Sequence, residues 1–422
     1  MPRIAAEHDV VVYHAALPGD GPRIQGGVEY RPVPIGLDVK TQRLAERAWP
    51  RLIRSADRPY FASSLYLWGF WRNVARAAAA QPADLIHVFN ASQALPVFRA
   101  ANPGARLVLH MQCEWLSQLD RHMIEGRIHH ADAIVGCSDY ISDKIRARFP
   151  ELAARCRTVF NGTLPLERRQ EAPLLPEPSV VGGVDVTGFG TETTARSGAK
   201  PERVRLLFVG RISPEKGLHV LLDAFRRAGS GGVDFELVVV GDESKIPPGL
   251  LARLDSDERV RDLESFFSGP YAGGYLKRLL DDLPAEVGRR VFLAGELSYP
   301  DVLDAYSGAD VFVFPSISEA FGIPVVEAMS AGMPVIASRV GGIPELVADG
   351  ESGLLVEPDD PQSLADALLE LARDAGRRSA MGAAGRKRVD QRFTWDRVAA
   401  QTLALYSDLL TEADVRELAA VA

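Results

Sequence analysis

The sequence predicts an α/β protein of two domains, each with a doubly wound parallel sheet. The chain has 422 residues, more than the ~100–200 residues of one ordinary domain. Short apolar runs alternate with helical patterns in both halves, which is the order of strands and helices in parallel sheets. Between the halves, residues 165–201 show no apolar periodicity and are rich in Pro, Gly, Ser and Thr. Such a composition favours a linker or a surface loop.

The first predicted domain comprises residues 1–164. Its expected strands are the apolar runs at residues 9–13, 85–89, 107–110, 133–136 and 158–160. Helical patterns at residues 65–80 and 140–149 lie between some of these strands. Because parallel strands need long crossover connections, this alternation favours a parallel sheet over a series of hairpins.

The second predicted domain comprises residues 202–391. Its expected strands are residues 205–209, 235–240, 291–293, 311–314 and 334–337, and its expected helices are residues 218–228, 299–306, 325–331 and 361–374. Residues 242–283 are longer than a simple connection needs and are interpreted as an insertion. The last segment, residues 392–422, is predicted to form helices that pack back on the first domain, because residues 395–410 are amphipathic.

Composition and charge exclude several function classes. A formal net charge of −8 argues against binding to nucleic acid. The three cysteines are widely spaced and lack metal-binding clusters, which disfavours a disulfide scaffold or a zinc site and suits a reducing cytosol. No apolar run approaches the ~20 residues of a membrane-spanning helix, and the N-terminal apolar run is too short for a signal peptide. A cytoplasmic protein is therefore expected.

Basic and aromatic residues gather in residues 31–80. This stretch has nine Lys and Arg against three Asp and Glu, 9 − 3 = +6, and seven Trp, Tyr and Phe are interleaved with them. One interpretation is peripheral contact with an anionic membrane at the inner membrane face, because basic aromatic surfaces lie against anionic lipid. The other is a solvated basic face over a packed aromatic core.

The segment SISEAFGIPVVEAMSAG, residues 316–332, carries the most chemical information. It follows a predicted buried strand and enters a short helix, so Glu319 is expected in the loop and Glu327 inside the helix. Residues 321–323 lie near the helix start, where backbone N–H groups are free. Ligands bind at the carboxyl edge of such sheets, and open amides at a helix start favour a phosphate. Acceptors for hydroxyls beside donors for phosphate indicate a nucleotide-sugar site.

A second loop, GRISPEKG at residues 210–217, follows the first strand of the second domain. Gly210 permits a sharp exit from the strand, and Arg211 and Lys216 lie in one loop region where two cations can meet a diphosphate. The alternative is a strand-to-helix turn with a surface Arg and Lys. The shared sheet edge with Glu319 favours the binding site.

These two segments are similar to the retaining GT-B glycosyltransferases of family GT4. The similarity covers residues 203–390, and Glu319 and Glu327 form the ends of the family's E-x7-E element. A looser similarity is present in the first domain, in LVLH, HADAIVGCSDY and VFNG. The resemblance implies two Rossmann-like domains facing a cleft, with the donor bound by the second domain.

The resemblance also implies residue roles. Arg211 and Lys216 would hold the donor diphosphate and offset the charge that develops as nucleoside diphosphate departs. Glu319 would accept hydrogen bonds from the sugar, and Glu327 from the ribose diol. His110 would lie beside the transferred sugar, although a structural histidine at a strand end is the alternative. The other implied donor contacts are Gly210, Gly241, Asp242, Gly295, Glu296, Leu297, Phe321, Gly322 and Ile323.

Two departures from the family pattern concern the acceptor side. The family opens with a strand and a glycine-rich loop, whereas residues 1–14 read like its second strand, so the first domain is expected to lack both, either because the start is truncated or because that part of the site is missing. His110 is followed by Met111-Gln112-Cys113-Glu114, whereas many relatives carry an acidic residue directly after this histidine. Separately, Asp255-Ser256-Asp257 mimics a metal-binding motif but lies in a polar stretch, so it is interpreted as a solvated loop.

The predicted function is retaining, metal-independent transfer of a sugar from a nucleotide sugar, UDP-linked in our interpretation, to a hydroxyl. The expected acceptor is a saccharide or a lipid-linked molecule, in the synthesis of cell-surface polysaccharide or glycolipid. No metal or cofactor is expected beyond the nucleotide sugar as co-substrate. Two alternatives remain open, a non-catalytic nucleotide-sugar-binding subunit and a GT-B sugar-nucleotide epimerase.

Overall fold

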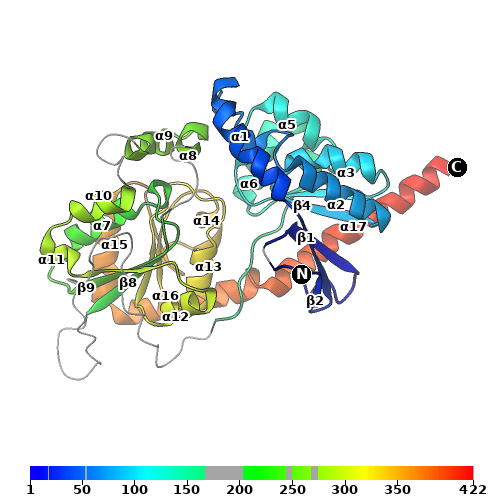
Figure 1. The fold of residues 1–422 in the computed structure, drawn as a ribbon. Coiled ribbons are helices and arrows are strands. Elements are labelled where there is room, and N and C mark those ends of the chain that lie inside the picture. The colour runs from blue at the N-terminus through cyan, green and yellow to red at the C-terminus, as the bar shows by residue number, and fades with distance from the viewer. Residues whose placement is uncertain (18, 53–54, 167–202, 244–249, 268–273, 422) are drawn as a thin grey trace. The chain divides into compact units, whose positions relative to one another are not determined.

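The computed structural model describes residues 1–422 apart from 18, 53–54, 167–202, 244–249, 268–273 and 422 (Figure 1). Nearly all of the predicted linker, residues 165–201, therefore lies outside the described residues. The chain divides into unit 1, which is Met1–Phe160 with Trp395–Ala422, and unit 2, which is Asn161–Thr394. Each unit combines helices with a parallel sheet, which confirms the predicted α/β class.

The core of unit 1 is a four-stranded parallel sheet in the order β4-β5-β6-β7. Its strands are Leu85–Phe89 (β4), Arg106–Met111 (β5), Ala133–Gly136 (β6) and Cys156–Thr158 (β7). All of β6 is apolar and buried, so both faces of the sheet are covered there. The intervening helices are α3 (Leu95–Ala101), α4 (Trp115–Gln118), α5 (Arg121–Ile128) and α6 (Asp139–Arg148).

The first predicted strand does not belong to this four-stranded sheet. It forms β1 (Val10–Ala15), which pairs in parallel with β3 (Val28–Val33), while β2 (Arg23–Gln25) pairs with β3 in antiparallel. This corrects the expectation of one sheet for the whole first domain. The sequence contained a signal for the hairpin, because Gly26 and Gly27 join β2 to β3 with φ of 58° and 76°.

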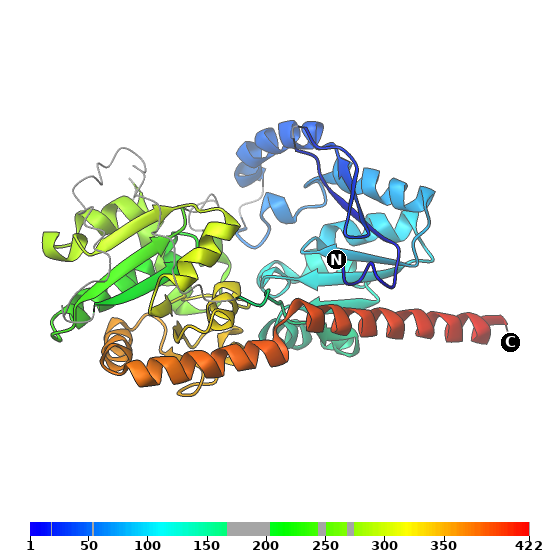
Figure 2. The same cartoon turned by 90° about the horizontal axis from the view of Figure 1, so that it is seen from below.

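The C-terminal helix α17 (Trp395–Val421) belongs to unit 1. It runs along the four-stranded sheet (Figure 2), where Leu405 and Leu409 pack in one cluster with Val108 of β5 and Val135 of β6. The amphipathic pattern of residues 395–410 therefore has its apolar side on the sheet.

The basic stretch of residues 31–80 contains α1 (Gly36–Leu52) and α2 (Trp68–Ala80). Asp38 accepts hydrogen bonds from the first amides of α2, at Gly69 and Phe70, both at 2.9 Å. Three of the basic side chains have internal partners: Arg31 binds Glu29, Arg58 binds Asp120 and Arg72 lies over Trp68. The side chains of Arg43, Arg47, Arg51 and Arg54 lie outside the described residues.

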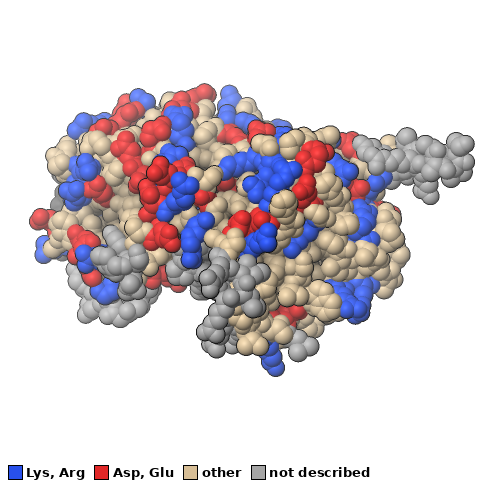
Figure 3. Space-filling view, turned by 90° about the horizontal axis from the view of Figure 1, so that it is seen from above, with Lys and Arg blue, Asp and Glu red and all other residues tan. Residues whose placement is uncertain are grey.

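In Figure 3, basic and acidic side chains are interspersed over part of the described face, and much of the rest is uncharged. None of the helices in the described part of the chain is long and apolar enough to cross a lipid bilayer.

Unit 2 contains a six-stranded parallel sheet in the order β10-β9-β8-β11-β12-β13. The strands are Val204–Val209 (β8), Phe235–Val240 (β9), Val291–Gly295 (β10), Val311–Phe314 (β11), Val335–Ser338 (β12) and Leu354–Val356 (β13). Strands β9 and β11 are apolar or buried at every position, as expected of central strands in a covered sheet.

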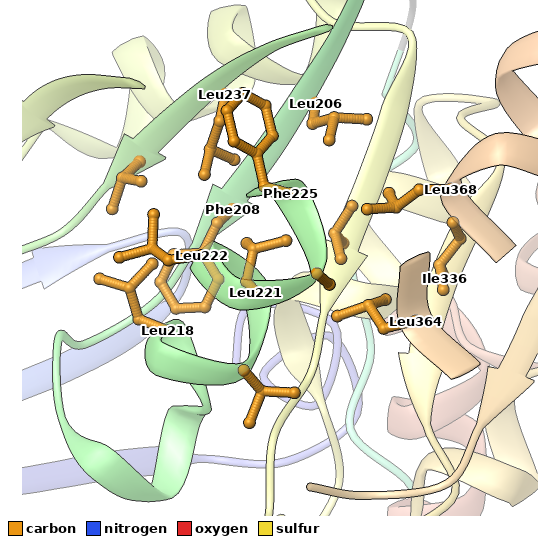
Figure 4. Packing of buried hydrophobic residues seen from close by; sticks show 14 of the residues in the cluster. Leu206, Phe208, Leu218, Leu221, Leu222, Phe225, Leu237, Ile336, Leu364 and Leu368 are labelled. Atoms are coloured by element: carbon orange, nitrogen blue, oxygen red, sulfur yellow. The ribbon is translucent and has the colours of Figure 1, made fainter. Parts of the chain in front are cut away.

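Helices α7 (Leu218–Gly229) and α15 (Pro361–Arg373) pack together on this sheet. Leu221 and Phe225 of α7 meet Leu364 and Leu368 of α15 over Leu206 in one fully buried cluster (Figure 4). The other helices of unit 2 are α8 (Leu250–Leu254), α9 (Glu258–Asp262), α10 (Tyr275–Asp281), α11 (Ala285–Gly288), α12 (Tyr299–Ser307), α13 (Ile323–Ser330), α14 (Ile343–Leu346) and α16 (Ala375–Arg392).

Candidate functional site

The two motif loops of unit 2 are joined through their backbones. They follow β8 and β11, which pair with each other, so both loops emerge at one edge of the sheet. The carbonyl of Glu215 accepts hydrogen bonds from the amide of Ile317 at 2.8 Å and the hydroxyl of Ser316 at 3.2 Å. Gly217 has φ of 71°, and a Cβ there would lie 1.9 Å from the carbonyl oxygen of Pro315. The close approach therefore requires glycine.

Lys216 and Glu319 form the ion pair at this edge. Lys216 Nζ lies 2.7 Å from Glu319 Oε2, and the two side chains are 13% and 14% exposed. The ammonium also lies 5.6 Å from the centre of the Phe314 ring. A mostly buried charge without a partner is costly, so each group stabilises the other while no ligand is bound. The structure thus brings together two of the predicted site residues.

The second predicted cation is less enclosed. Arg211 lies 3.4 Å from Glu215 Oε1 and its side chain is 43% exposed, whereas Glu215 is buried. Its side chain is therefore partly open to solvent, a suitable arrangement for exchanging one anionic partner for another.

The amides at the start of α13 are partly occupied, in contrast to the expectation that residues 321–323 offer free N–H groups. Glu319 Oε1 accepts from the amides of Ala320 at 3.1 Å and Phe321 at 3.4 Å. The carboxylate folds back onto its own loop because the positive helix start attracts it. Gly322, with φ of 107°, is the residue before the helix, and Ile323 is exposed.

Glu327 lies inside α13, as predicted, and is buried. Both its oxygens accept hydrogen bonds: Oε1 from the Tyr299 hydroxyl at 3.1 Å and Oε2 from the Tyr306 hydroxyl at 2.9 Å. Burial raises the pKa of Glu327, and the two phenols oppose that shift because they stabilise the ionised form. Our sequence reasoning missed both tyrosines, although their spacing of seven on the predicted helix 299–306 placed them on one face.

The remaining predicted donor contacts follow the neighbouring strands. Gly241 donates from its amide to the carbonyl of Gly295 at 2.8 Å, and a Cβ on Gly241 would lie 1.9 Å from the carbonyl oxygen of Gly210. The ends of β8, β9 and β10 are therefore in contact at three glycines. The three other predicted contacts, Asp242, Glu296 and Leu297, lie in the loops that follow β9 and β10.

His110 lies in unit 1, on β5, and is 5% exposed. Its Nδ1 is 3.2 Å from Nε2 of His87 on β4, and Nδ1 of His87 is 2.6 Å from the hydroxyl of Tyr406 on α17. The ring of Phe89 stacks on His87 and His110 at 4.6 and 5.1 Å between centres. Burial lowers the pKa of His87 to about 3 and that of His110 to about 4, so both are neutral at pH 7.

The Asp-Ser-Asp segment caps a helix. Asp257 accepts from the amide of Arg259 at the start of α9, and Asp255 accepts from the amide of Asp257. Asp255 is buried, which corrects the interpretation of this residue as part of a solvated loop. Among the described residues, no group of three or more His, Cys, Asp or Glu side chains could hold a metal ion.

Two family models match the chain. Residues 191–388 match the model described as glycosyl transferases group 1, and residues 3–163 match glycosyltransferase family 4. Among curated proteins, the D-inositol 3-phosphate glycosyltransferase of Corynebacterium urealyticum is 32% identical over 242 residues, which cover 55% of this chain and 51% of that protein. The chain therefore spans about half the length of this relative.

Solved structures share the fold over most of the chain. The sucrose-phosphate synthase of Thermosynechococcus elongatus matches with a TM-score of 0.66 and 21% identity, over 97% of this chain and 91% of that one. The HepE protein of Anabaena in complex with UDP and glucose matches with a TM-score of 0.60 and 20% identity, over 96% and 94%. At these identities the likeness is one of fold, and it confirms the GT-B class.

Proposed function

The chain belongs to the group 1 glycosyltransferases of family 4, and we propose that it transfers a sugar from a nucleotide-sugar donor to a hydroxyl acceptor. The observation that carries this proposal is the pair of Lys216 and Glu319, 2.7 Å apart at the sheet edge where α13 begins. A cation, a carboxylate and a helix start in one place supply the groups that bind a diphosphate and sugar hydroxyls.

When the donor binds, the contact between Lys216 and Glu319 is replaced by contacts of each residue with the donor. The diphosphate takes over Lys216 and the partly exposed Arg211, and Glu319 is released to accept hydrogen bonds from the sugar. As the bond to the sugar breaks, negative charge grows on the departing diphosphate and the preorganised cations stabilise it. The cations and the start of α13 supply the positive charge, so the proposal requires no metal.

Glu327 binds the ribose of the donor in this proposal. A carboxylate has about four acceptor positions, and the two tyrosine hydroxyls take one on each oxygen. The remaining positions accept from the ribose diol. The donor is proposed to be UDP-linked, supported by the UDP and glucose in the HepE complex that shares this fold.

The transfer proceeds with retention of configuration in this proposal. The acceptor oxygen forms its bond to the anomeric carbon on the face from which the diphosphate departs. A departing phosphate oxygen takes the proton of the acceptor hydroxyl, so atoms and charge balance without a protein nucleophile. His110 is proposed to bind a hydroxyl of the transferred sugar.

The acceptor is proposed to be a saccharide or a lipid-linked molecule of a cell-surface polysaccharide or glycolipid, handled at the cytosolic membrane face. The support is the basic stretch of residues 31–80, in which Leu44, Leu65 and Trp68 are exposed. Sedimentation with anionic liposomes at low salt, but not with zwitterionic ones, is the expected result. Equal sedimentation with both would contradict the membrane contact.

A donor screen tests the proposed reaction. The purified chain is incubated with UDP-, GDP- and ADP-sugars and with saccharide or glycolipid acceptors, and both released nucleotide and glycosylated product are measured. Nucleoside diphosphate released together with a glycosylated product is expected. Donor binding without turnover against any acceptor would instead indicate a binding subunit. Conversion of the donor into an epimer would indicate an epimerase.

A further inference from the structure

Three side chains of unit 1 form a hydrogen-bonded row that we call the histidine chain: Tyr406, His87 and His110. They come from three elements, α17, β4 and β5, and the chain ends at His110 Nε2. This nitrogen is buried and has no hydrogen-bond partner among the described residues. Buried polar groups in folded proteins are normally paired, so an unpaired one at a predicted site residue points to a ligand.

The two distances favour one placement of the protons. Tyr406 Oη and His87 Nδ1 are 2.6 Å apart, which is closer to the ~2.7–2.8 Å typical of hydroxyl donors than to the ~2.9–3.0 Å typical of N–H donors. The short separation favours the Tyr406 hydroxyl as the donor and His87 Nδ1 as the acceptor. A neutral imidazole has one N–H, so His87 carries its proton on Nε2.

The same reasoning sets the proton of the next ring. His87 Nε2–H donates to Nδ1 of His110 across 3.2 Å. Since Nδ1 of His110 is then the acceptor, the single proton of this neutral ring is on Nε2. The buried, unpartnered atom of His110 is therefore a donor.

We propose that Tyr406 and His87 are positioning residues that fix the Nε2–H form of His110, which donates a hydrogen bond to a substrate oxygen. Taking this oxygen as a hydroxyl of the transferred sugar rests on the proposed function. The assignment of the His110 tautomer does not depend on the proposed function. A neutral donor suits an uncharged hydroxyl, because a buried cation would need a counter-charge that a sugar lacks.

The phenol of Tyr406 can be removed with a matched control on the same helix. Tyr406→Phe keeps the ring and deletes the hydroxyl that donates to His87. Thr402→Val deletes another buried hydroxyl of α17, one that donates to the carbonyl of Val398 in its own helix. A difference between the two variants reports the histidine chain rather than the packing of α17.

Nuclear magnetic resonance of the full chain labelled with ¹⁵N-histidine tests the tautomer without substrate. His110→Gln assigns the signals of His110. The wild type and Thr402→Val are expected to show His110 protonated on Nε2, and Tyr406→Phe a mixture of both forms. A wild-type His110 protonated on Nδ1, or an unchanged signal in Tyr406→Phe, would overturn the proposal.

Kinetics then tests the role of the donor. Tyr406→Phe is expected to lower kcat/KM by about 3- to 10-fold, the size of one neutral hydrogen bond, with no change in Thr402→Val. Equal rates in both variants would contradict the role toward substrate. If no nucleotide sugar is turned over by the wild type, the proposed function fails, whereas the resonance measurement still decides the tautomer.

Discussion

The site of unit 2 and the histidine chain of unit 1 hold their functional groups in opposite ways. In unit 2, Lys216 and Glu319 are charged and neutralise each other at 2.7 Å. In unit 1, His110 is neutral and is held by a second neutral ring. A charged group at rest needs a counter-charge, which a diphosphate can later replace. A neutral donor needs only orientation. The comparison teaches that the partner of each functional group in the absence of ligand indicates which kind of ligand group it can bind.

Removing the cation of unit 2 should give the largest effect. Lys216→Ala is expected to lower kcat about 100- to 1,000-fold, because the developing charge loses a preorganised partner and Glu319 is left unpaired. The matched control is Lys277→Ala, whose exposed ammonium pairs with Asp281 on helix α10. Turnover rates of both purified variants are compared. A wild-type rate for Lys216→Ala would refute the charged site.

Moving the carboxylate without removing it should give the next largest effect. A Cβ on Gly341 would lie 1.6 Å from the backbone oxygen of Glu319, so Gly341→Ala must displace that loop. A displacement near 1 Å costs about 100-fold in rate. Gly350→Ala is the control, because Gly350 has φ of 76° but nothing within 4 Å. Both variants carry backbone strain, and only Gly341→Ala should lose activity beyond its loss of stability.

The neutral state of the buried His87 predicts that unit 1 loses stability in acid. The pKa of His87 is lowered to about 3 in the folded protein, whereas the unfolded chain takes up the proton near 6.5. The unfolded state therefore binds more protons below pH 6.5, and stability is lost as the pH falls. Through His87 alone, the free energy of unfolding should fall by about 2 kcal/mol between pH 8 and pH 5.

Fluorescence can follow this loss in unit 1 alone, because all five tryptophans of the chain lie there. Denaturant unfolding at pH 8 and pH 5 is expected to show a smaller pH dependence in His87→Phe than in the wild type. His122→Gln, which changes an exposed histidine of the same unit, is the control. Identical pH dependence in His87→Phe and the wild type would contradict a buried neutral His87.

The smallest effect concerns the tyrosines of unit 2. Tyr299→Phe removes one of the two hydrogen bonds to Glu327, which leaves the pKa of this carboxyl group still higher and its orientation looser. UDP should bind about 3- to 10-fold more weakly, with KM raised and kcat little changed. Calorimetry with UDP and 2′-deoxy-UDP checks the cause. If Tyr299→Phe weakened both ligands equally, the effect would not pass through the ribose.

The elements of unit 2 were predictable because their signals are local. Strand 311–314 and the loop with Glu319 follow from an apolar run and the residues directly after it, and the structure has β11 at those residues. The partners of these residues were not predictable. Lys216 lies 103 positions from Glu319, and their pairing depends on the adjacency of β8 and β11.

The histidine chain shows the same limit more strongly. The sequence indicates His110 at a strand end, but His87 is the third residue of the short strand β4, and Tyr406 lies on a helix 319 positions away from His87. No periodicity connects them. They meet because α17 packs on the sheet of unit 1 and because β4 and β5 pair with His87 beside Val108.

The sequence by itself determined the α/β class, the two domains and the charged residues of the motif loops, since apolar runs and turn residues act on their immediate neighbours. The tertiary structure alone decided that β1 leaves the main sheet, that Glu319 occupies the amide of Phe321, and that two tyrosines hold Glu327. The physical reason is that hydrogen bonds and ion pairs depend on distances of a few ångströms, which are set by packing between segments far apart in the chain.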